Sequence, residues 1–400
     1  MNSSDKKDRM STRLCHDDTW YTQHQGAVVP PIYQNSTFVF PDWSAIEAAF
    51  GEPERSAIYT RGNNPTVGLA EEKLAELAGA QRARLFASGM GAISAAILHC
   101  VKQGDHILTV RNIYGPAQNF IRQYLSVKCG IAATFLSGTD PQAFVDYLRP
   151  NTRLIYLESP ASATFELQDL EAIADIARSR GIKTVIDNTL ATPVFQRPLE
   201  LGIDLEVHSG SKYLGGHSDL VCGVIMGRES DLNRIILAEQ AWLGAKMSPF
   251  EAWLLLRSLR TLPARMRLHQ QQALYLARWL EGHPAVRKVY YPGLPSFPQY
   301  DLARRQMRGT TGLLSIELAT DRVLHVQQFV DQLRLFKLGV SWGGHESLVY
   351  APLISYLREM GEEQFRKTGI PPGLIRLSVG LEDSEDLKAD LDQALAWVPV

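Results

Sequence analysis

The sequence predicts an α/β protein: a mostly parallel sheet flanked by helices, followed by a smaller α+β domain. Two patterns predict this class. In residues 64–255, short apolar runs rich in β-branched residues alternate with helical patterns, as parallel strands joined by helices do. In residues 256–400, long helical patterns precede a second block of strands and helices. A chain of 400 residues also exceeds an ordinary domain of about 100–200 residues.

The first segment, residues 1–63, is predicted to be an N-terminal arm. It shows little hydrophobic periodicity and contains turn formers such as Pro30-Pro31 and Gly62-Asn63-Asn64-Pro65. We expect an irregular, extended segment that depends on contacts with another part of the protein for its order.

The middle segment, residues 64–255, contains most of the predicted strands. Helices are expected over Leu69–Leu77, Ala92–Val101 and Leu167–Arg180, and strands over Ala83–Ala87, His106–Val110, Ala132–Leu136, Leu154–Glu158, Lys183–Asp187 and Leu205–His208. The runs are apolar on both faces, which indicates strands covered by helices on both sides.

The transition to the C-terminal segment is marked by two helical patterns, Phe250–Leu259 and Met266–Leu280. Pro263 is expected to interrupt the connection between them, because proline removes a backbone donor. Strands and helices are predicted from Val289 to the end.

Composition excludes several classes of protein. Hydrophobic residues make up 45% and charged residues 21%, as in folded globular proteins, and the net charge of -2 argues against binding to nucleic acid or to an anionic membrane. The four cysteines, Cys15, Cys100, Cys129 and Cys222, form no CxxC pair, so neither disulfides nor a metal site are predicted. With a polar start and no long apolar run, the chain is expected to be cytoplasmic.

Polar residues that follow apolar runs are the first candidates for a site, because ligands of open α/β sheets lie beyond the carboxyl ends of the strands. Ser88-Gly89-Met90-Gly91 stands between a predicted strand and a helix, where free amides and the helix dipole favour a phosphate. A tight turn without a ligand is an equal alternative for these residues alone.

Asp187 and Lys212 also follow predicted strands. Asp187 would need a cationic partner if it were buried, although a helix cap or turn explains it as well. Lys212, in His208-Ser-Gly-Ser-Lys-Tyr213, could be desolvated, which would lower its pKa and make its amine a nucleophile and base.

Arg376 lies inside an apolar run, Leu374–Val379, near the C-terminus. Its guanidinium suits a substrate carboxylate, and an internal salt bridge is the alternative. Together, a phosphate cradle, a buried acid, an activated lysine and this arginine match what an amino acid bound to pyridoxal phosphate (PLP) requires.

In these residues the sequence resembles the cysteine and methionine metabolism family of PLP enzymes, from about Gln34 to Leu387. The segment from His208 to Asp219 is the most specific match. The resemblance implies the PLP-dependent transferase-like fold of fold type I. It also implies a homo-oligomer, a tetramer of two active dimers, that acts on a small sulfur amino acid.

The resemblance also implies a role for individual residues. Lys212 would hold the cofactor covalently and act as the catalytic base, and Tyr114 would stack on the cofactor ring and take part in catalysis. The implied cofactor-binding residues are Tyr59, Arg61, Ser88, Gly89, Met90, Tyr114, Asp187, Ser209, Ser211 and Lys212, with Tyr59 and Arg61 reaching the phosphate of a neighbouring subunit. The implied substrate-binding residues are Ser341, Trp342 and Arg376.

Local motifs are similar to those of the β-lyase branch of the family. These are the segments Glu158–Asp169, Tyr114–Asn119 and Ser341–Ser347; the tryptophan at position 342 replaces the leucine that is usual in γ-type members. The implied reaction is elimination from cystathionine to homocysteine, pyruvate and ammonia, a transsulfuration step that serves methionine biosynthesis.

Other interpretations remain. The arm motif Tyr59–Thr66 and Val340 are closer to γ-type members, which include methionine and cystathionine γ-lyases, cystathionine γ-synthases and O-acylhomoserine sulfhydrylases. A noncatalytic PLP-binding protein would carry the same residues. A nucleotide-binding oxidoreductase fits poorly, because Gly89-x-Gly91-x-x-Ser94 lacks the third glycine of the dinucleotide fingerprint.

Overall fold

The computed structural model describes residues 9–16, 22–161, 163–355, 358 and 370–399. Its larger part is built on a seven-stranded sheet in the order β1-β7-β6-β5-β4-β2-β3. The strands of this sheet are β1 Arg82–Phe86, β2 His106–Val110, β3 Ala132–Leu136, β4 Thr152–Glu158, β5 Lys183–Asp187, β6 Leu205–Ser209 and β7 Gly223–Gly227. The strands β6, β5, β4, β2 and β3 run parallel, whereas β7 is antiparallel to both of its neighbours. The predicted mostly parallel sheet is therefore confirmed.

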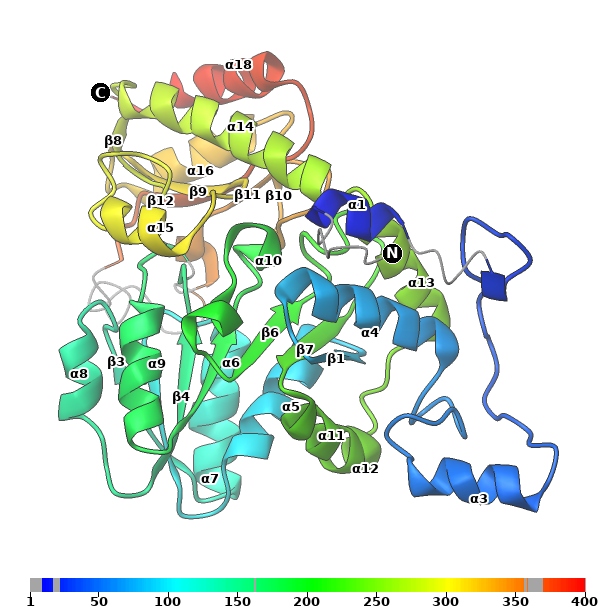
Figure 1. Ribbon diagram of the computed structural model, residues 1–400. Coiled ribbons are helices and arrows are strands. Elements are labelled where there is room, and N and C mark those ends of the chain that lie inside the picture. The colour runs from blue at the N-terminus through cyan, green and yellow to red at the C-terminus, as the bar shows by residue number, and fades with distance from the viewer. Residues whose placement is uncertain (1–8, 17–21, 162, 356–357, 359–369, 400) are drawn as a thin grey trace, which may run out of the picture.

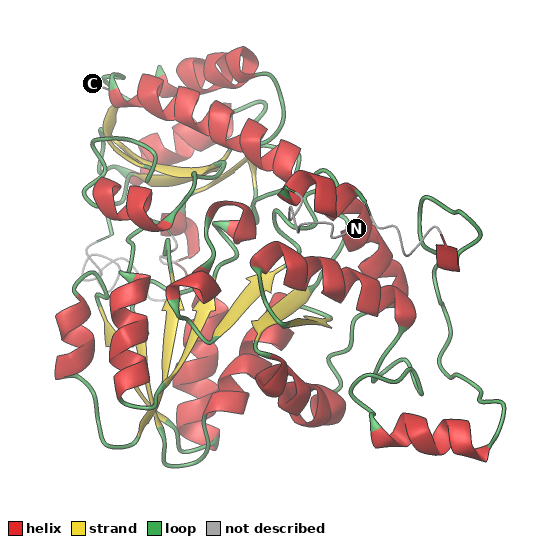
Figure 2. Cartoon of the chain, viewed as in Figure 1, coloured by secondary structure: helices red, strands yellow, loops and turns green. Residues whose placement is uncertain are grey.

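Helices flank this sheet, as Figures 1 and 2 show. They are α4 Pro65–Ala78, α5 Gly89–Cys100, α6 Gly115–Asn119, α7 Ser126–Lys128, α8 Pro141–Asp146, α9 Leu170–Ser179, α10 Thr192–Phe195, α11 Glu229–Ile235, α12 Ala241–Leu243 and α13 Pro249–Leu259. Phe120–Leu125 and Ile236–Gln240 form π-helical turns, and Pro198–Leu201 forms a 3₁₀ turn. The sheet is therefore buried by helices, and β2, β5 and β7 consist of buried or nearly buried residues.

The C-terminal part is organised around a five-stranded sheet in the order β10-β11-β12-β9-β8. Its strands are β8 Val286–Tyr290, β9 Leu313–Leu318, β10 Lys337–Leu338, β11 Leu348–Tyr350 and β12 Leu374–Ser378, and its helices include α14 Leu262–Glu281, α15 Tyr300–Gln306, α16 Val323–Gln332 and α18 Ser384–Leu395. A separate apolar core joins α14, α16 and α18 to this sheet. The second, smaller α+β unit expected from the sequence is therefore present.

The connection between the two parts follows the expectation for Pro263. Helix α13 ends at Leu259, and α14 begins at Leu262 with the proline in its first turn, where a missing backbone donor costs little. Helix α13 runs through the expected boundary at residue 255, so the limits of the domains remain a prediction.

The arm is more regular than expected. Among its described residues, Met10–Cys15 form helix α1 and Trp43–Gly51 form helix α3, so the expectation of an irregular segment is wrong for these residues. Asp42 starts α3 by accepting a hydrogen bond from the amide of Ala45 at 2.8 Å. The arm projects from the body of the molecule, with α3 at its far end (Figure 1). Residues 1–8 and 17–21 of the predicted arm lie outside the described residues.

Candidate active site

A cavity of about 720 Å³ lies beyond the carboxyl ends of β4, β5 and β6, and residues of the C-terminal part also line it. Most of the predicted site residues line this cavity: Ser88, Gly89, Met90, Tyr114, Asp187, Ser209, Ser211, Lys212, Ser341, Trp342 and Arg376. Tyr59 and Arg61 are not among its lining residues. The structure thus brings together residues that are up to 288 positions apart in the chain, from Ser88 to Arg376.

One end of the cavity is formed by the start of helix α5. Ser88 caps the helix by accepting the amide of Gly91 at 3.0 Å, and the amides of Gly89 and Met90 have no acceptor within the helix. A side chain at position 89 would place its Cβ 2.8 Å from the Cβ of Ser209, so only glycine lets strand β6 approach here. The result is a cradle of free amides and a helix dipole, which suits a phosphate.

Ser209 and Ser211, at and just after the end of β6, make different hydrogen bonds. The backbone amide of Ser209 donates to the hydroxyl of Thr189 at 2.8 Å, which ties β6 to the segment after β5. The hydroxyl of Ser211 accepts the amide of Cys222 at 3.0 Å and donates to the carbonyl of the same residue at 3.4 Å. Ser211 therefore lines the cavity while its hydroxyl is engaged by the backbone of Cys222.

Lys212 extends its amine into the cavity. Its Nζ donates a hydrogen bond of 2.6 Å to the hydroxyl of Ser341 and lies 5.5 Å from the centre of the Trp342 ring. Burial and the positive charge of Arg376 lower the pKa of the amine to about 8, against an opposing effect of Asp187. A substantial fraction of the amine is therefore neutral near physiological pH, as a nucleophile or base requires.

Asp187 ends strand β5 and is buried, with 6% of its surface exposed. It accepts hydrogen bonds from the amide of Thr189 at 3.0 Å and from the Thr189 hydroxyl. Burial raises the pKa of the carboxyl group, and the bonds from Thr189 and the charges of His208 and Lys212 partly offset this effect. A cation placed next to this carboxylate would stabilise its charged form.

Tyr114 immediately precedes helix α6, and its backbone amide donates to Glu158 at 2.5 Å. Burial raises the pKa of its phenol, and the negative charges of Asp187 and Glu158 raise it further. The phenol therefore stays protonated near neutral pH and can serve as a proton donor. Tyr114 is one of the residues that line the cavity.

Arg376 lies in β12, on the side of the cavity formed by the C-terminal part. Its Nη2 donates to the carbonyl of Val340 at 2.6 Å, and its guanidinium lies 5.0 Å from the ring centre of Tyr350. Burial lowers the pKa of the guanidinium to about 10, so the group is charged at neutral pH. Among the described residues, no carboxylate lies within ion-pair distance of Arg376, and the guanidinium is one of the groups that line the cavity, where it could bind a ligand's carboxylate.

Several lining residues were not singled out from the sequence. Glu158 ends β4 next to Asp187 in the sheet register, and the same rule about strand ends could have found it. Thr189 follows Asp187 by two positions, a spacing typical of an Asx turn. Glu346 accepts a hydrogen bond from the hydroxyl of Ser218 at 2.6 Å, and no sequence pattern indicates this contact between two distant loops.

The cavity therefore provides what PLP requires: amides at a helix start for the phosphate, a buried acid for the ring nitrogen and a lysine amine of lowered pKa for the aldehyde. The acid fits the group well, because Asp187 forms no direct ion pair with any described residue and a protonated ring nitrogen would give it one. No group of three His, Cys, Asp or Glu side chains suited to a metal ion occurs within the described ranges. The fold and this cavity together define an α/β enzyme that uses PLP.

Comparison with known proteins assigns the chain within this class. The model of the Cys/Met metabolism PLP-dependent enzyme family matches residues 11–396. The chain belongs to this family and is a PLP-dependent lyase with the fold of type I PLP enzymes. Within the part of the chain that the structure describes, no helix has both the length and the apolar character needed to cross a lipid bilayer.

The relatives carry more than one activity in their names. An L-methionine gamma-lyase from Porphyromonas gingivalis is 41% identical over 92% of this chain and 93% of the relative. One from Pseudomonas putida is 40% identical over 99% of both chains. A cystathionine beta-lyase from Coxiella burnetii is 38% identical over 98% of this chain and 99% of the relative. These names do not select one substrate for this chain.

Proposed function

We propose that the protein catalyses the α,β-elimination of cystathionine, in which water is consumed and homocysteine, pyruvate and ammonia are formed. Trp342 carries this proposal, because its indole lines the cavity 5.5 Å from the Lys212 amine and packs against Tyr213 with ring centres 5.5 Å apart. The active form is proposed to be a cytoplasmic homotetramer built from two active dimers.

PLP, when bound, draws electrons from the substrate Cα and makes its proton acidic. In the proposed mechanism, Arg376 binds the substrate carboxylate and orients Cα toward Lys212. The neutral amine of Lys212 removes the Cα proton, and the carboxylate of Asp187 keeps a positive charge on the ring nitrogen. The bond between Cβ and sulfur then breaks, and Lys212 or Tyr114 gives a proton to the departing thiolate.

The position of Trp342 favours β- over γ-elimination. A γ-elimination also requires removal of a proton from Cβ, so the base has to reach two successive carbon atoms. The hydrogen bond from Lys212 to Ser341 and the nearby indole restrict the space in which the amine can move. A single proton abstraction at Cα requires less movement of the amine.

A second candidate is the γ-elimination of methionine to methanethiol, 2-oxobutyrate and ammonia. The observation in its favour is that relatives 40% and 41% identical to this chain are named L-methionine gamma-lyase. Both candidates use Lys212, Asp187 and Arg376 in the same way and differ in the carbon from which sulfur departs.

The products distinguish the two reactions. We expect purified holoenzyme to release pyruvate and homocysteine from cystathionine, measured by chromatography of the keto acids and thiols. Trp342→Leu is expected to raise the ratio of 2-oxobutyrate to pyruvate, because the smaller side chain frees space beside Lys212. Lys212→Ala, the control, should stay folded and form neither keto acid. Release of 2-oxobutyrate from methionine, with no pyruvate from cystathionine, would contradict the proposal.

A further inference from the structure

Arg84 is a buried arginine in strand β1, outside the cavity described above. Only 3% of its surface is exposed, and its neighbours Ala83, Leu85 and Phe86 are buried apolar residues. A buried guanidinium is costly unless its donors find acceptors. The groups that Arg84 binds must therefore offset the cost of burying its charge in an apolar strand.

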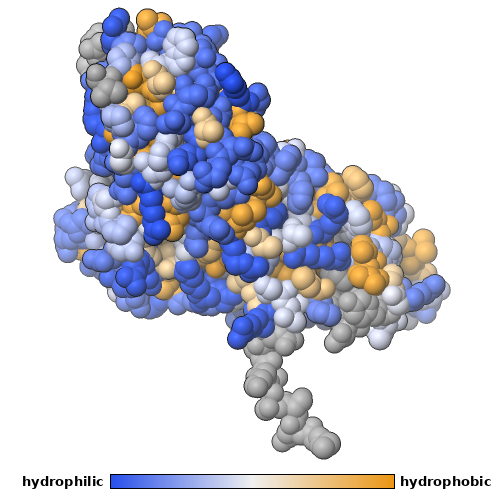
Figure 3. All heavy atoms as spheres, turned by 90° about the horizontal axis from the view of Figure 1, so that it is seen from above, coloured by the Kyte–Doolittle hydropathy of each residue, from blue (hydrophilic) through white to orange (hydrophobic). Residues whose placement is uncertain are grey.

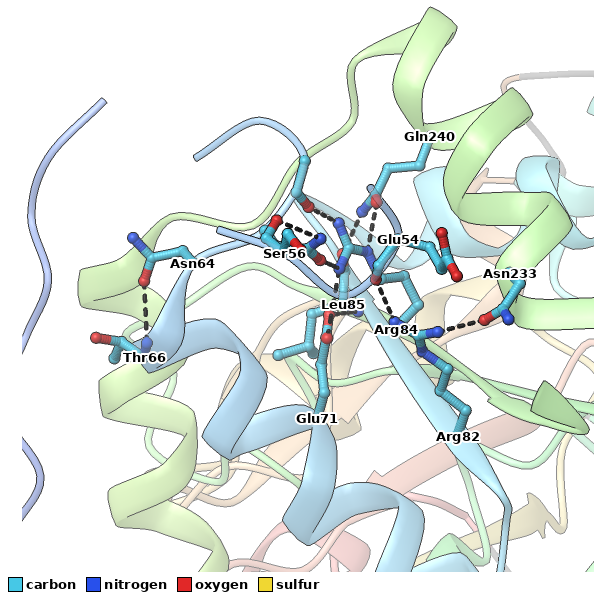
Figure 4. A network of polar contacts seen from close by, with 12 residues as sticks. Glu54, Ser56, Asn64, Thr66, Glu71, Arg82, Arg84, Leu85, Asn233 and Gln240 are labelled. Carbon is cyan, nitrogen blue, oxygen red and sulfur yellow. Dashed lines mark hydrogen bonds and ion pairs between the residues drawn. The ribbon is translucent and has the colours of Figure 1, made fainter. Parts of the chain in front are cut away.

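The partners of Arg84 come from the arm and from two helical segments (Figure 4). Its Nη2 donates to the carbonyl of Gly62, its Nη1 to the side-chain oxygen of Asn63 at 2.8 Å, and its Nε to the side-chain oxygen of Gln240. Glu71 lies 3.5 Å from Nη1 and supplies the opposite charge. All three nitrogens of the guanidinium are thus engaged, and two of them hold the arm.

Two of the residues that contact Arg84 also form hydrogen bonds with the backbone of strand β1. Glu71 accepts the backbone amide of Leu85 at 2.8 Å, and Gln240 donates to the carbonyl of Leu85 at 2.9 Å. Asn63, in turn, donates to the carbonyls of Pro53 at 2.9 Å and Ser56 at 3.1 Å. The arm is therefore joined to the sheet through a set of hydrogen bonds that leaves Arg84 little freedom.

The part of the arm that Arg84 holds is the turn from Tyr59 to Asn63. The carbonyl of Tyr59 accepts the amides of Gly62 at 2.8 Å and of Asn63 at 3.2 Å, so the chain reverses within these residues. Tyr59 and Arg61 both belong to this turn, and both residues are exposed. Arg84 binds the two residues that directly follow Arg61.

The charges of the residues that line the cavity indicate that this turn could supply a cation for the phosphate. Among the described residues, its lining cations are Lys212 and Arg376, and it also contains Glu158, Asp187 and Glu346. The phosphate cradle at the start of α5 thus consists of neutral groups. A phosphate dianion there would be stabilised by a further cation from outside this chain.

We propose that Arg84 is a positioning residue that fixes the turn from Tyr59 to Asn63, so that Arg61 of one subunit reaches the cofactor phosphate in the neighbouring subunit. The inference rests on the proposed PLP-dependent function and its dimer. Its distinctive consequence is that loss of Arg84 impairs cofactor binding in the partner subunit, and not in the subunit that carries the substitution.

The first test is Arg84→Leu, which keeps an apolar side chain in the strand and removes the guanidinium. We expect the dissociation constant of PLP, measured by equilibrium dialysis of the apoprotein, to rise about tenfold or more. Arg84→Lys keeps the charge but lacks the planar fork that binds Gly62, Asn63 and Gln240 together, so it should give an intermediate value.

Mixed dimers separate positioning from a general loss of stability. In one, an Arg84→Leu chain pairs with a Lys212→Ala chain; in the other, a wild-type chain pairs with a chain carrying both substitutions. Two affinity tags isolate each mixed species, and borohydride reduction followed by mass spectrometry of the Lys212 peptide measures attached cofactor. Both dimers contain the same substitutions, so a purely structural effect would be equal in the two.

We expect the first mixed dimer to bind PLP as tightly as a dimer of wild-type and Lys212→Ala chains, because its competent lysine receives an intact arm. The second should bind weakly. Equal losses in both, or a loss confined to the first, would overturn the proposal, as would unchanged affinity of the Arg84→Leu protein. Failure of wild-type Lys212 to attach PLP would also overturn the proposed function, whereas absence of lyase turnover with the expected binding pattern would leave this inference standing.

Discussion

The Lys212 amine is acted on by two neighbouring charges in opposite directions. Arg376 and burial favour its neutral form, whereas Asp187 favours the protonated form, and the net result is a pKa of about 8. The same arginine is proposed to bind the substrate carboxylate. The arrival of a carboxylate would therefore weaken the effect of Arg376 on the amine, which links substrate binding to the protonation of the base.

Reactivity of the apoprotein should follow this pKa. Only the neutral amine reacts with a trace amount of acetic anhydride, so labelling of Lys212 should rise with pH through about 8 and then level off. A lysine in a model peptide should level off only above about pH 10.4. Mass spectrometry of the Lys212 peptide measures the extent of labelling.

Arg376→Leu is the informative variant for this measurement. Loss of the positive charge should move the labelling midpoint of Lys212 upward, but by less than the full distance to the model peptide, because burial is the larger cause of the lowered pKa. A midpoint for the wild-type protein above pH 10 would contradict the environment described for this amine.

The key site residues could be predicted from the sequence because each follows or interrupts an apolar run. Asp187 and Lys212 come at or just after the ends of strands, and Arg376 stands within one. Their roles, unlike their positions, came from resemblance to a family. Glu346 could not be found in this way, because its contact with Ser218 depends on how two loops meet in space.

At the scale of elements, the start of helix α5 lies close to the end of strand β6 because residue 89 is a glycine and has no side chain. A methyl group at Gly89 would meet Ser209, which also lines the cavity, so the helix start and the end of β6 would have to separate. Separation would move the free amides away from the position of the phosphate.

We therefore expect Gly89→Ala to weaken PLP binding about tenfold or more, because even a small displacement weakens hydrogen bonds to a phosphate. Gly68→Ala is the matched control: Gly68 lies in helix α4, and an added Cβ there meets nothing within 4 Å. This control should raise the free energy of unfolding by about 0.5–1 kcal/mol and leave PLP binding unchanged. Dialysis and urea unfolding measure the two effects. Normal PLP affinity in Gly89→Ala would contradict the role of this glycine.

The strands of the large sheet were predictable because burial on both faces leaves a nearly continuous apolar run. β2, β3 and β5 agree with the predicted limits, and α4 begins four residues before the expected start because Asn64 and Pro65 form its cap. Strand β7 was not predicted, although its residues Gly223–Gly227 are buried; its flanking glycines resemble those of turns. Helix α3 was not predicted either, because its start is set by the cap at Asp42, which hydrophobic periodicity does not reveal.

The whole molecule leaves large apolar side chains exposed on and near the arm. Val39 is 93% exposed, Trp43 80%, Phe50 63% and Trp242 81%. Apolar atoms also reach the surface in patches on the face seen from above (Figure 3). Exposed apolar groups of this size are typical of interaction surfaces, so the proposed oligomer would cover them. In the proposed oligomer, a second copy of the chain would cover these side chains and stabilise the projecting arm.

This association gives a prediction at the scale of the whole molecule. Trp43→Glu and Trp242→Glu should each weaken self-association about tenfold or more, because a charge would be placed in a buried contact. Sedimentation equilibrium at several protein concentrations measures the effect. Trp397→Glu is the control: Trp397 is 51% exposed but lies in the C-terminal part, after α18, and the substitution should leave association unchanged. Because Arg61 is proposed to complete the partner's phosphate site, dissociation should also weaken PLP binding. A wild-type protein that is monomeric at micromolar concentration and still holds PLP tightly would contradict both the oligomer and the shared site.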